Sequence, residues 1–112
     1  MEGNKLSISE KDFSTQVEYL LDLFDWRWCH FRPARTEDGW TTALSGFMGF
    51  PDYIAVKESL RKQRLLFFEL KSEKGKLTKN QNDWLEALKK SGYCEVYLFR
   101  PSNAERLAEI LR

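Results

Sequence analysis

The chain has 112 residues, of which 42% are hydrophobic and 14% aromatic, which is enough apolar mass for one core, so we expect a single domain over residues 1–112. It contains no run of 18 apolar residues and does not begin with a basic segment followed by an apolar stretch, so neither a membrane span nor a secretory signal is expected. The formal net charge of +1 argues against a generic phosphate binder with a large basic excess. Cys29 and Cys94 lack metal-site or redox spacing and lie in strand-like contexts, so we expect buried free thiols.

The first half of the chain contains a predicted helix and three predicted strands. Apolar residues at helical spacing predict the helix over residues 9–24, with Ser7 or Ser9 as its N-cap. Strand-like segments follow, separated by a loop or irregular hairpin at residues 33–49; they cover residues 26–32, 52–56 and 64–71.

The second half begins with a capping-box pattern, because Gln81 follows Thr78 by three residues. This pattern predicts a helix that ends near Gly92, a residue that can adopt the left-handed C-cap conformation. A fourth strand at residues 93–99 follows, and Ser102 is expected to cap a short terminal helix. Since a helix connects the third and fourth strands, we expect that pair to be parallel and the fold class to be α/β.

The third strand, RLLFFELK at residues 64–71, is apolar on both faces, which is typical of a central strand covered on both sides. Glu69 and Lys71 are two residues apart, so they share one face near the carboxyl end of this strand. An ionised group in such a place is costly unless another group compensates it. The carboxyl end of a central strand is also a common location for active sites.

Asp52 begins the neighbouring strand, directly after Pro51. If the two strands form a hairpin, Asp52 and Glu69 converge, and two adjacent carboxylates repel unless they share a proton or a cation. Oxygen ligands of this kind suit Mg²⁺ or Mn²⁺, and Lys71 could bind phosphate or help to deprotonate a water. These are the parts needed to hydrolyse a phosphodiester. The alternative is an ion pair of Glu69 with Lys71 and a turn-capping role for Asp52.

These residues belong to a longer pattern that resembles a known family. Gly49-Phe50-Pro51-Asp52 is followed by Glu69-Leu70-Lys71 and then by Gly75-Lys76-Leu77-Thr78 with Gln81 and Trp84. The pattern is similar to the VRR-NUC domain of the PD-(D/E)xK nuclease superfamily, and in particular to its small standalone, virus-type members. The similarity extends from about Ser9 to Phe99.

The resemblance implies a restriction-endonuclease-like αβββαβ core with a central mixed sheet flanked by helices. It implies that Asp52 and Glu69 hold the metal, that the backbone carbonyl of Leu70 is a further ligand, and that Lys71 serves the attacking water. A glutamine at the position of Gln81 also lies beside the site in this family. The alternative for Gln81 is a capping role alone.

A glutamate on the first helix often completes the site in this family, and two candidates exist. Glu10 falls within about 40° of the centre of the apolar stripe of that helix, whereas Glu18 falls about 110° from it. We therefore expect Glu10 to be a catalytic metal ligand, with a helix-start carboxylate as the alternative. Glu18 is expected to be solvated surface.

Basic residues around this motif are candidates for DNA contacts, which position a backbone without reading sequence. They are His30, Arg32, Arg35, Lys74, Lys76 and Lys79. The alternative for His30 is a hydrogen-bonded strand residue, and Trp84 is expected to anchor the second helix. The loop from Thr36 to Met48 could pack on a partner subunit or wedge into a DNA branch point.

The resulting expectation is a structure-selective DNA endonuclease dependent on Mg²⁺ or Mn²⁺, acting on branched DNA and most simply on a four-way (Holliday) junction. The resemblance to the standalone members of the family implies a homodimer, whose two sites suit the two-fold symmetry of such a junction. We expect it to work in the cytoplasm of a bacterial or phage-infected cell. The alternatives are a repair nuclease subunit directed to flaps, nicks or ends, and an inactive DNA-binding scaffold.

Overall fold

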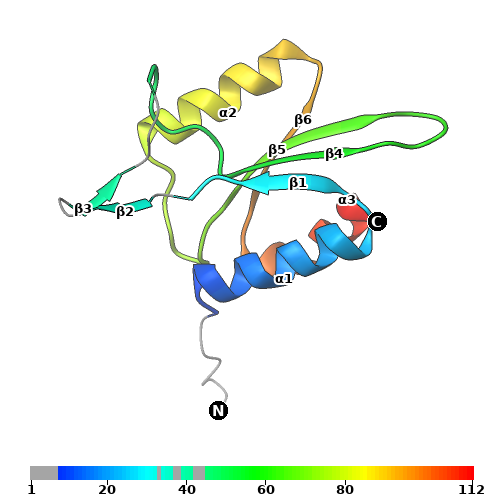
Figure 1. Ribbon diagram of the computed structural model, residues 1–112, viewed down its shortest axis with the longest axis horizontal. Helices are drawn as coiled ribbons and strands as arrows, with labels where there is room; N and C mark the ends of the chain where they lie inside the picture. The colour runs from blue at the N-terminus through cyan, green and yellow to red at the C-terminus, as the bar shows by residue number, and fades with distance from the viewer. Residues whose placement is uncertain (1–7, 33, 37–38, 42–44) are drawn as a thin grey trace.

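The computed structural model describes residues 8–32, 34–36, 39–41 and 45–112 (Figure 1). Ten elements follow one another along the chain: α1 (Glu10–Leu23), β1 (Arg27–His30), β2 (Ala34–Thr36), β3 (Gly39–Thr41), β4 (Tyr53–Lys57), β5 (Arg64–Leu70), α2 (Lys79–Ser91), β6 (Glu95–Phe99), a 3-10 turn (Pro101–Asn103) and α3 (Ala104–Leu111). None of the described helices is both long and apolar enough to cross a membrane.

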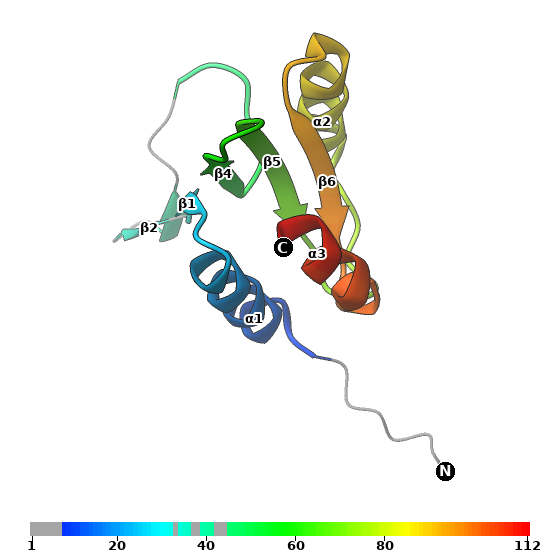
Figure 2. The same ribbon diagram turned by 90° about the vertical axis from the view of Figure 1, so that its right-hand side faces the viewer.

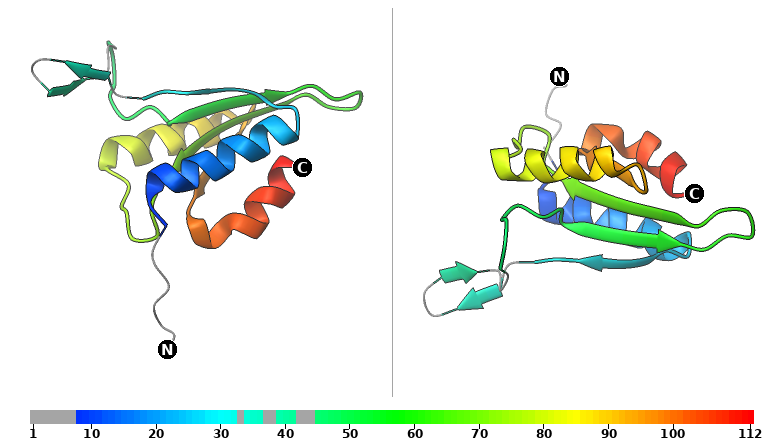
Figure 3. Two further views of the ribbon diagram at one scale, coloured as in Figure 1. Left: turned by 60° about the horizontal axis from the view of Figure 1, so that its bottom comes forward. Right: turned by 90° about the horizontal axis from the view of Figure 1, so that it is seen from above.

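The main sheet has four strands in the order β1-β4-β5-β6. β4 pairs antiparallel with both β1 and β5, whereas β5 and β6 are parallel, so the sheet is mixed. Helix α2 covers one face, and α1 and α3 cover the other (Figure 2). The expected α/β class, the hairpin of the second and third strands and the parallel last pair are therefore confirmed. The short antiparallel β2–β3 pair lies apart from the main sheet, within the segment expected to be a loop or irregular hairpin (Figure 3).

Successive side chains of the central strand β5 point to opposite faces of the sheet, and both faces are covered. Leu66, Phe68 and Leu70 are fully buried in the core that α1 and α3 cover. On the opposite face Phe67 packs edge-on against Phe50, which in turn packs against Trp84 of α2. Trp84 thus anchors α2 as expected, although its indole is only half-buried and donates to the Phe47 carbonyl at 3.2 Å.

The helix ends mostly follow the sequence signals. Ser9 caps α1 by accepting from the Asp12 amide at 3.0 Å, and both hydrogen bonds of the Thr78–Gln81 capping box are present. Gly92 ends α2 with a φ of 76°. The Ser102 expectation was wrong: this residue lies in the 3-10 turn, and its hydroxyl and amide both donate to the Glu73 carboxylate instead of capping α3.

Both cysteines are free thiols, but the burial expected for them was wrong, because Cys29 is exposed and Cys94 is only half-buried. Strand β1 is at the edge of the sheet, and its residues alternate between exposed and half-buried. Cys29 lies on the exposed side, because α2 packs on β5 and β6 rather than on this edge.

Candidate active site

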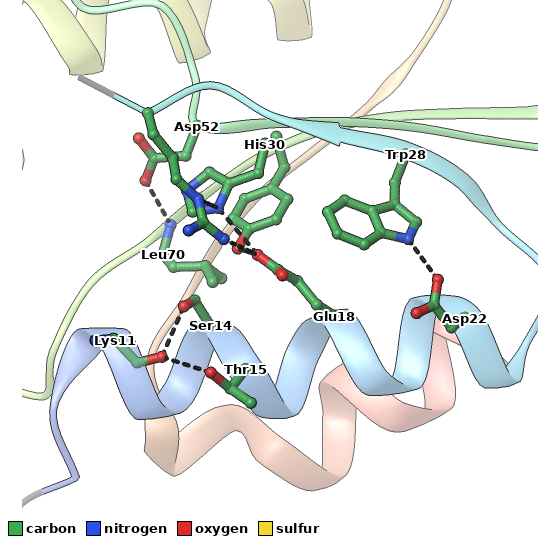
Figure 4. A network of polar contacts seen from close by, with 11 residues as sticks. Lys11, Ser14, Thr15, Glu18, Asp22, Trp28, His30, Asp52 and Leu70 are labelled. Carbon is green, nitrogen blue, oxygen red and sulfur yellow. Dashed lines mark hydrogen bonds and ion pairs between the residues drawn. The ribbon is translucent and has the colours of Figure 1, made fainter. Parts of the chain in front are cut away.

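The Pro-Asp and Glu-x-Lys segments meet at one end of the β4–β5 hairpin. Tyr53 is paired with Phe68 across the two antiparallel strands. Asp52, which precedes Tyr53, therefore lies opposite Glu69, which follows Phe68. The Asp52 carboxylate accepts from the backbone amide of Leu70 at 3.4 Å (Figure 4). The hairpin therefore brings together two carboxylates that are 17 residues apart in the sequence.

Glu69 is the only charged side chain in the core among the residues described, with 1% of its surface exposed. The pKa of its carboxyl group is raised to about 9, first by burial and then by the adjacent Asp52 carboxylate, while the positive charge of Lys71 opposes both effects. Its Oε2 accepts from Gln81 at 3.3 Å, but its Oε1 has no hydrogen-bond partner. A buried oxygen without a partner is costly, so this carboxylate is suited to a bound cation or a proton.

Gln81 connects the start of α2 to this carboxylate. Its side-chain carbonyl accepts from the Thr78 amide at 2.9 Å, while its Nε2 donates to Glu69. The two interpretations of Gln81 are therefore compatible, because one amide group caps the helix and also contacts the site.

Gly49 sets the distance between the Pro-Asp segment and α2. Its φ is +91°, and a Cβ at this position would lie 2.7 Å from the backbone carbon of Asn80 and 2.8 Å from the Gln81 nitrogen. Only a residue without a side chain allows this close approach. The glycine of the Gly-Phe-Pro-Asp pattern thus places Asp52 beside the helix that carries Gln81.

Lys71 directly follows β5 and is half-buried. Its amide donates to the Phe99 carbonyl at 3.1 Å, which extends the parallel pairing of β5 with β6. The turn after it is held by Arg100, whose Nη1 donates to the carbonyls of Ser72, Glu73 and Gly75. The end of β6 therefore fixes both the backbone of Lys71, through Phe99, and the turn that follows Lys71, through Arg100.

A pocket of about 300 Å³ opens beside Asp52. It is lined by residues of α1, β1, the segment after β1, β4 and β5: Glu10, Lys11, Ser14, His30, Arg32, Asp52, Tyr53 and Leu70. Glu10 thus reaches the same pocket as Asp52 and Leu70 from the first turn of α1. Among the residues described, no three His, Cys, Asp or Glu side chains are grouped closely enough to hold a metal by themselves, so the role of Glu10 as a ligand stays a prediction.

Glu18 is not solvated surface, and that expectation was wrong. Its side chain is only 18% exposed, and its Oε2 accepts from the hydroxyl of Tyr53 at 2.5 Å and lies 2.9 Å from His30 Nδ1 (Figure 4). The helical wheel places Glu18 outside the apolar stripe, but that outer edge of α1 faces β1. A sequence signal did exist, because Glu18 follows Glu10 by eight residues and Ser14 by four, and all three therefore lie on one side of the helix.

The candidate DNA contacts fall in two places. His30 and Arg32 line the pocket, whereas the loop residues Lys74 and Lys76 are exposed and Lys79 pairs with Asp83 at 2.7 Å on the surface of α2. The side chain of Arg35 lies outside the described part of the structure, as do residues 37–38 and 42–44 of the Thr36–Met48 loop. Phe47 and Met48 at the end of that loop are 87% and 55% exposed and line a second, apolar pocket beside α2.

The donor set at the hairpin end fits a hard divalent cation. Two carboxylates, one of them buried with a free oxygen, lie beside the backbone of Leu70 and a lysine. The mixed sheet flanked by helices, with this acidic pair at the end of its central strand, places the protein in the class of restriction-endonuclease-like folds.

Comparison with known families leads to the same class. Residues 36–100, more than half of the chain, match the VRR-NUC domain. The chain therefore belongs to the VRR-NUC family and carries a nuclease domain, which implies DNA as its partner. The matched range contains Asp52, Glu69, Lys71 and Gln81, whereas Glu10 precedes it. Neither the curated proteins nor the solved structures include a match to this chain.

Proposed function

We propose that this protein is a structure-selective DNA endonuclease that depends on Mg²⁺ or Mn²⁺ and hydrolyses phosphodiester bonds at the Asp52–Glu69 pair. The observation that carries the proposal is the free Oε1 of Glu69, which is buried opposite a second carboxylate and next to a lysine. A buried oxygen without a partner is costly in a purely structural role, whereas a bound cation would satisfy it.

Each residue of the site has a distinct role in this proposal. Asp52, Glu69 and the carbonyl of Leu70 would hold the metal, and Glu10 would complete the set from α1. When bound, the metal supplies a positive charge that polarises the phosphate and lowers the pKa of a water. Lys71 places and helps to deprotonate the attacking water, and Gln81 holds Glu69 in the orientation that the ligand set requires.

The charge distribution supports selection by DNA shape. A net charge of +1 gives little generic affinity for a polyanion, so binding depends on local basic residues. Those around the site are Arg32, Lys74 and Lys76, which are exposed and therefore free to meet a backbone. We propose a four-way junction as the first substrate, because it presents phosphates in a fixed branched geometry.

We also propose that the enzyme works as a homodimer. Two copies related by a two-fold axis match the two-fold symmetry of a four-way junction, so that each copy cuts one strand. The exposed Phe47 and Met48 beside α2 support an apolar contact of this kind. Light scattering at micromolar protein concentration measures the mass in solution. The dimer predicts twice the mass of one chain, and the mass of a single chain would contradict it.

The test of function is cleavage of a labelled substrate panel: a four-way junction, a 5′ flap, a nicked duplex and a linear duplex, each with Mg²⁺, Mn²⁺ or EDTA. The variants Asp52→Ala and Lys71→Ala are assayed beside the wild-type protein, with Lys90→Ala, an exposed lysine at the far end of α2, as the control. Paired symmetric nicks in the junction are expected, and they should vanish in EDTA and in both site variants.

Other outcomes separate the parts of the proposal. Cleavage of flaps or ends alone would retain the chemistry and contradict the junction as substrate. Absence of cleavage on all substrates, with DNA binding that is unchanged in both site variants, would contradict the nuclease proposal and indicate a DNA-binding scaffold.

A further inference from the structure

A cluster of four polar side chains lies beside the carboxylate pair and takes no part in the hydrolysis proposed above. Glu18 Oε2 accepts from Tyr53 Oη at 2.5 Å and lies 2.9 Å from His30 Nδ1 and 3.4 Å from Arg32 Nη2. The imidazole of His30 stacks on the Tyr53 ring with centroids 4.0 Å apart. The stacking on Tyr53 therefore fixes the plane of the His30 ring, and the contact with Glu18 fixes the direction in which Nδ1 points.

The contacts of Nδ1 determine which tautomer His30 adopts. This nitrogen lies 2.9 Å from Glu18 Oε2 and 3.1 Å from Arg32 Nε, and it can satisfy only one of them, because it carries either a proton or a lone pair in the ring plane. A carboxylate oxygen only accepts, and it would repel a lone pair at 2.9 Å. Nδ1 therefore carries the proton and donates to Glu18. No described residue hydrogen bonds to Nε2.

His30 and Arg32 both line the 300 Å³ pocket that contains Asp52, so an anion in that pocket meets an imidazole and a guanidinium together. We propose that His30 and Arg32 form a phosphate-binding subsite for the DNA strand, and that Glu18 is the positioning residue that fixes His30 with Nε2 available to the phosphate. The subsite rests on the proposed function, since it takes a backbone phosphate of the same DNA. When the ring carries its second proton, Nε2–H donates to a phosphate oxygen, and Arg32 adds donors and charge.

The family match does not cover these residues, so it assigns them no role. Glu18, His30 and Arg32 all precede residue 36, where the match to the VRR-NUC domain begins. A purely structural Glu18 needs only the Tyr53 hydroxyl as its partner. The additional contact with His30 fixes a second polar group at the wall of the pocket that contains Asp52.

The first experiment reads the tautomer directly and needs no activity. His30 is the only histidine of the chain, so a long-range ¹H–¹⁵N spectrum of the full protein reports one imidazole. The Nδ1–H form is expected. Glu18→Gln should convert it to the Nε2–H form, because both the Arg32 Nε–H and the new amide can donate to Nδ1.

The matched control is Asp22→Asn, which removes the same charge from the same helix. Asp22 Oδ1 accepts from Trp28 Nε1 at 2.8 Å, one turn further along α1 and away from His30 (Figure 4). This variant should leave the imidazole signals unchanged. An Nε2–H form in the wild-type protein, or the same form in wild type and Glu18→Gln, would overturn the positioning role.

The second experiment tests the ligand. Inorganic phosphate and then a short single-stranded oligonucleotide are titrated in EDTA while the His30 signals are followed. Both probes should shift the signals, and Arg32→Ala should weaken oligonucleotide binding about tenfold, the effect of one charge-assisted hydrogen bond. Signals that do not move at saturating oligonucleotide would overturn the subsite.

Cleavage kinetics separate this subsite from the metal site. Loss of a contact made equally in the bound and transition states raises KM and leaves kcat nearly unchanged, so Arg32→Ala should raise KM about tenfold, whereas Lys71→Ala should lower kcat. A loss of kcat at constant KM in Arg32→Ala would contradict the subsite. A wild-type protein that cleaves no DNA would contradict the proposed function, while the spectra would still decide the subsite.

Discussion

Gln81 Nε2 donates to Glu69 Oε2 at 3.3 Å, so the first turn of α2 directly orients the buried carboxylate of β5. The same side chain completes the capping box with Thr78. Helix stability and site geometry are therefore coupled through one amide group, and they can be separated by changing one partner at a time.

Gln81→Ala should lower both stability and activity. Loss of half of the capping box should cost about 1 kcal/mol, and a misplaced Glu69 should reduce cleavage about 100-fold. Thr78→Ala should cost a similar free energy of unfolding and leave cleavage within about threefold of wild type. Urea unfolding and single-turnover cleavage measure the two effects. Equal loss of activity in both variants would contradict a direct role of Gln81 at the site.

Gly49 and Gly46 offer a matched pair for the approach of the Pro-Asp segment to α2. Both have a positive φ, at +91° and +98°, but a Cβ at Gly46 would meet no atom within 4 Å. Gly46→Ala should cost only the backbone strain of about 1–2 kcal/mol. Gly49→Ala should cost more and should also displace Asp52, because its Cβ would collide with the backbone at Asn80.

Thermal unfolding and cleavage of both glycine variants give the measurement. A Gly49→Ala protein as stable and as active as Gly46→Ala would show that the close contact with α2 is not needed for the site.

The pKa of Glu69 predicts how stability depends on pH without metal. Its folded value of about 9 lies above the usual carboxyl range, so between about pH 5 and pH 9 the folded chain holds a proton that the unfolded chain has released. This group therefore stabilises the fold at low pH, and its contribution falls by up to about 1.4 kcal/mol per pH unit as the pH rises.

Glu69→Gln removes that titration. In EDTA its free energy of unfolding should increase relative to wild type from pH 6 to pH 8, as measured by urea denaturation. Parallel pH curves for the two proteins would mean that Glu69 is already ionised across this range.

Arg100 should be essential for the turn that follows Lys71. Its guanidinium donates to three backbone carbonyls, so Arg100→Ala should cost about 2–3 kcal/mol and weaken cleavage by letting Lys71 move. Arg106→Ala, which removes an exposed arginine of α3, should change neither quantity. Urea unfolding and cleavage assays measure the two effects. Wild-type stability in Arg100→Ala would contradict the role of Arg100 in holding this turn.

The sequence was sufficient for the elements and for the convergence of Asp52 with Glu69. A strand that is apolar on both faces has to be central, and a short connection between two strands makes a hairpin, so the pairing of these carboxylates followed from local pattern. Gln81 could be placed for the same reason, since the capping box and the helical stripe are both local signals.

The features that were missed depend on which element covers which part of the sheet. Glu18 is half-buried because α1 packs against β1, where it contacts His30, and Cys29 is exposed because α2 packs on β5 and β6 rather than on the β1 edge. Ser102 bonds to Glu73, a residue 29 positions earlier, rather than to its own helix. For Cys29 and Ser102 such contacts between distant segments leave no periodic signal in one sequence, whereas the helical spacing of Glu10, Ser14 and Glu18 was a signal that could have been used.

The central claim is that Asp52 and Glu69 hold a divalent metal, and the most direct test is Mn²⁺ binding followed by electron paramagnetic resonance at pH 8. The wild-type protein should remove Mn²⁺ from solution, and Asp52→Asn and Glu69→Gln should each weaken this binding at least about tenfold. Glu86→Gln, an exposed carboxylate of α2, should bind as wild type does. Equal Mn²⁺ affinity in the wild-type protein and both site variants would contradict the account.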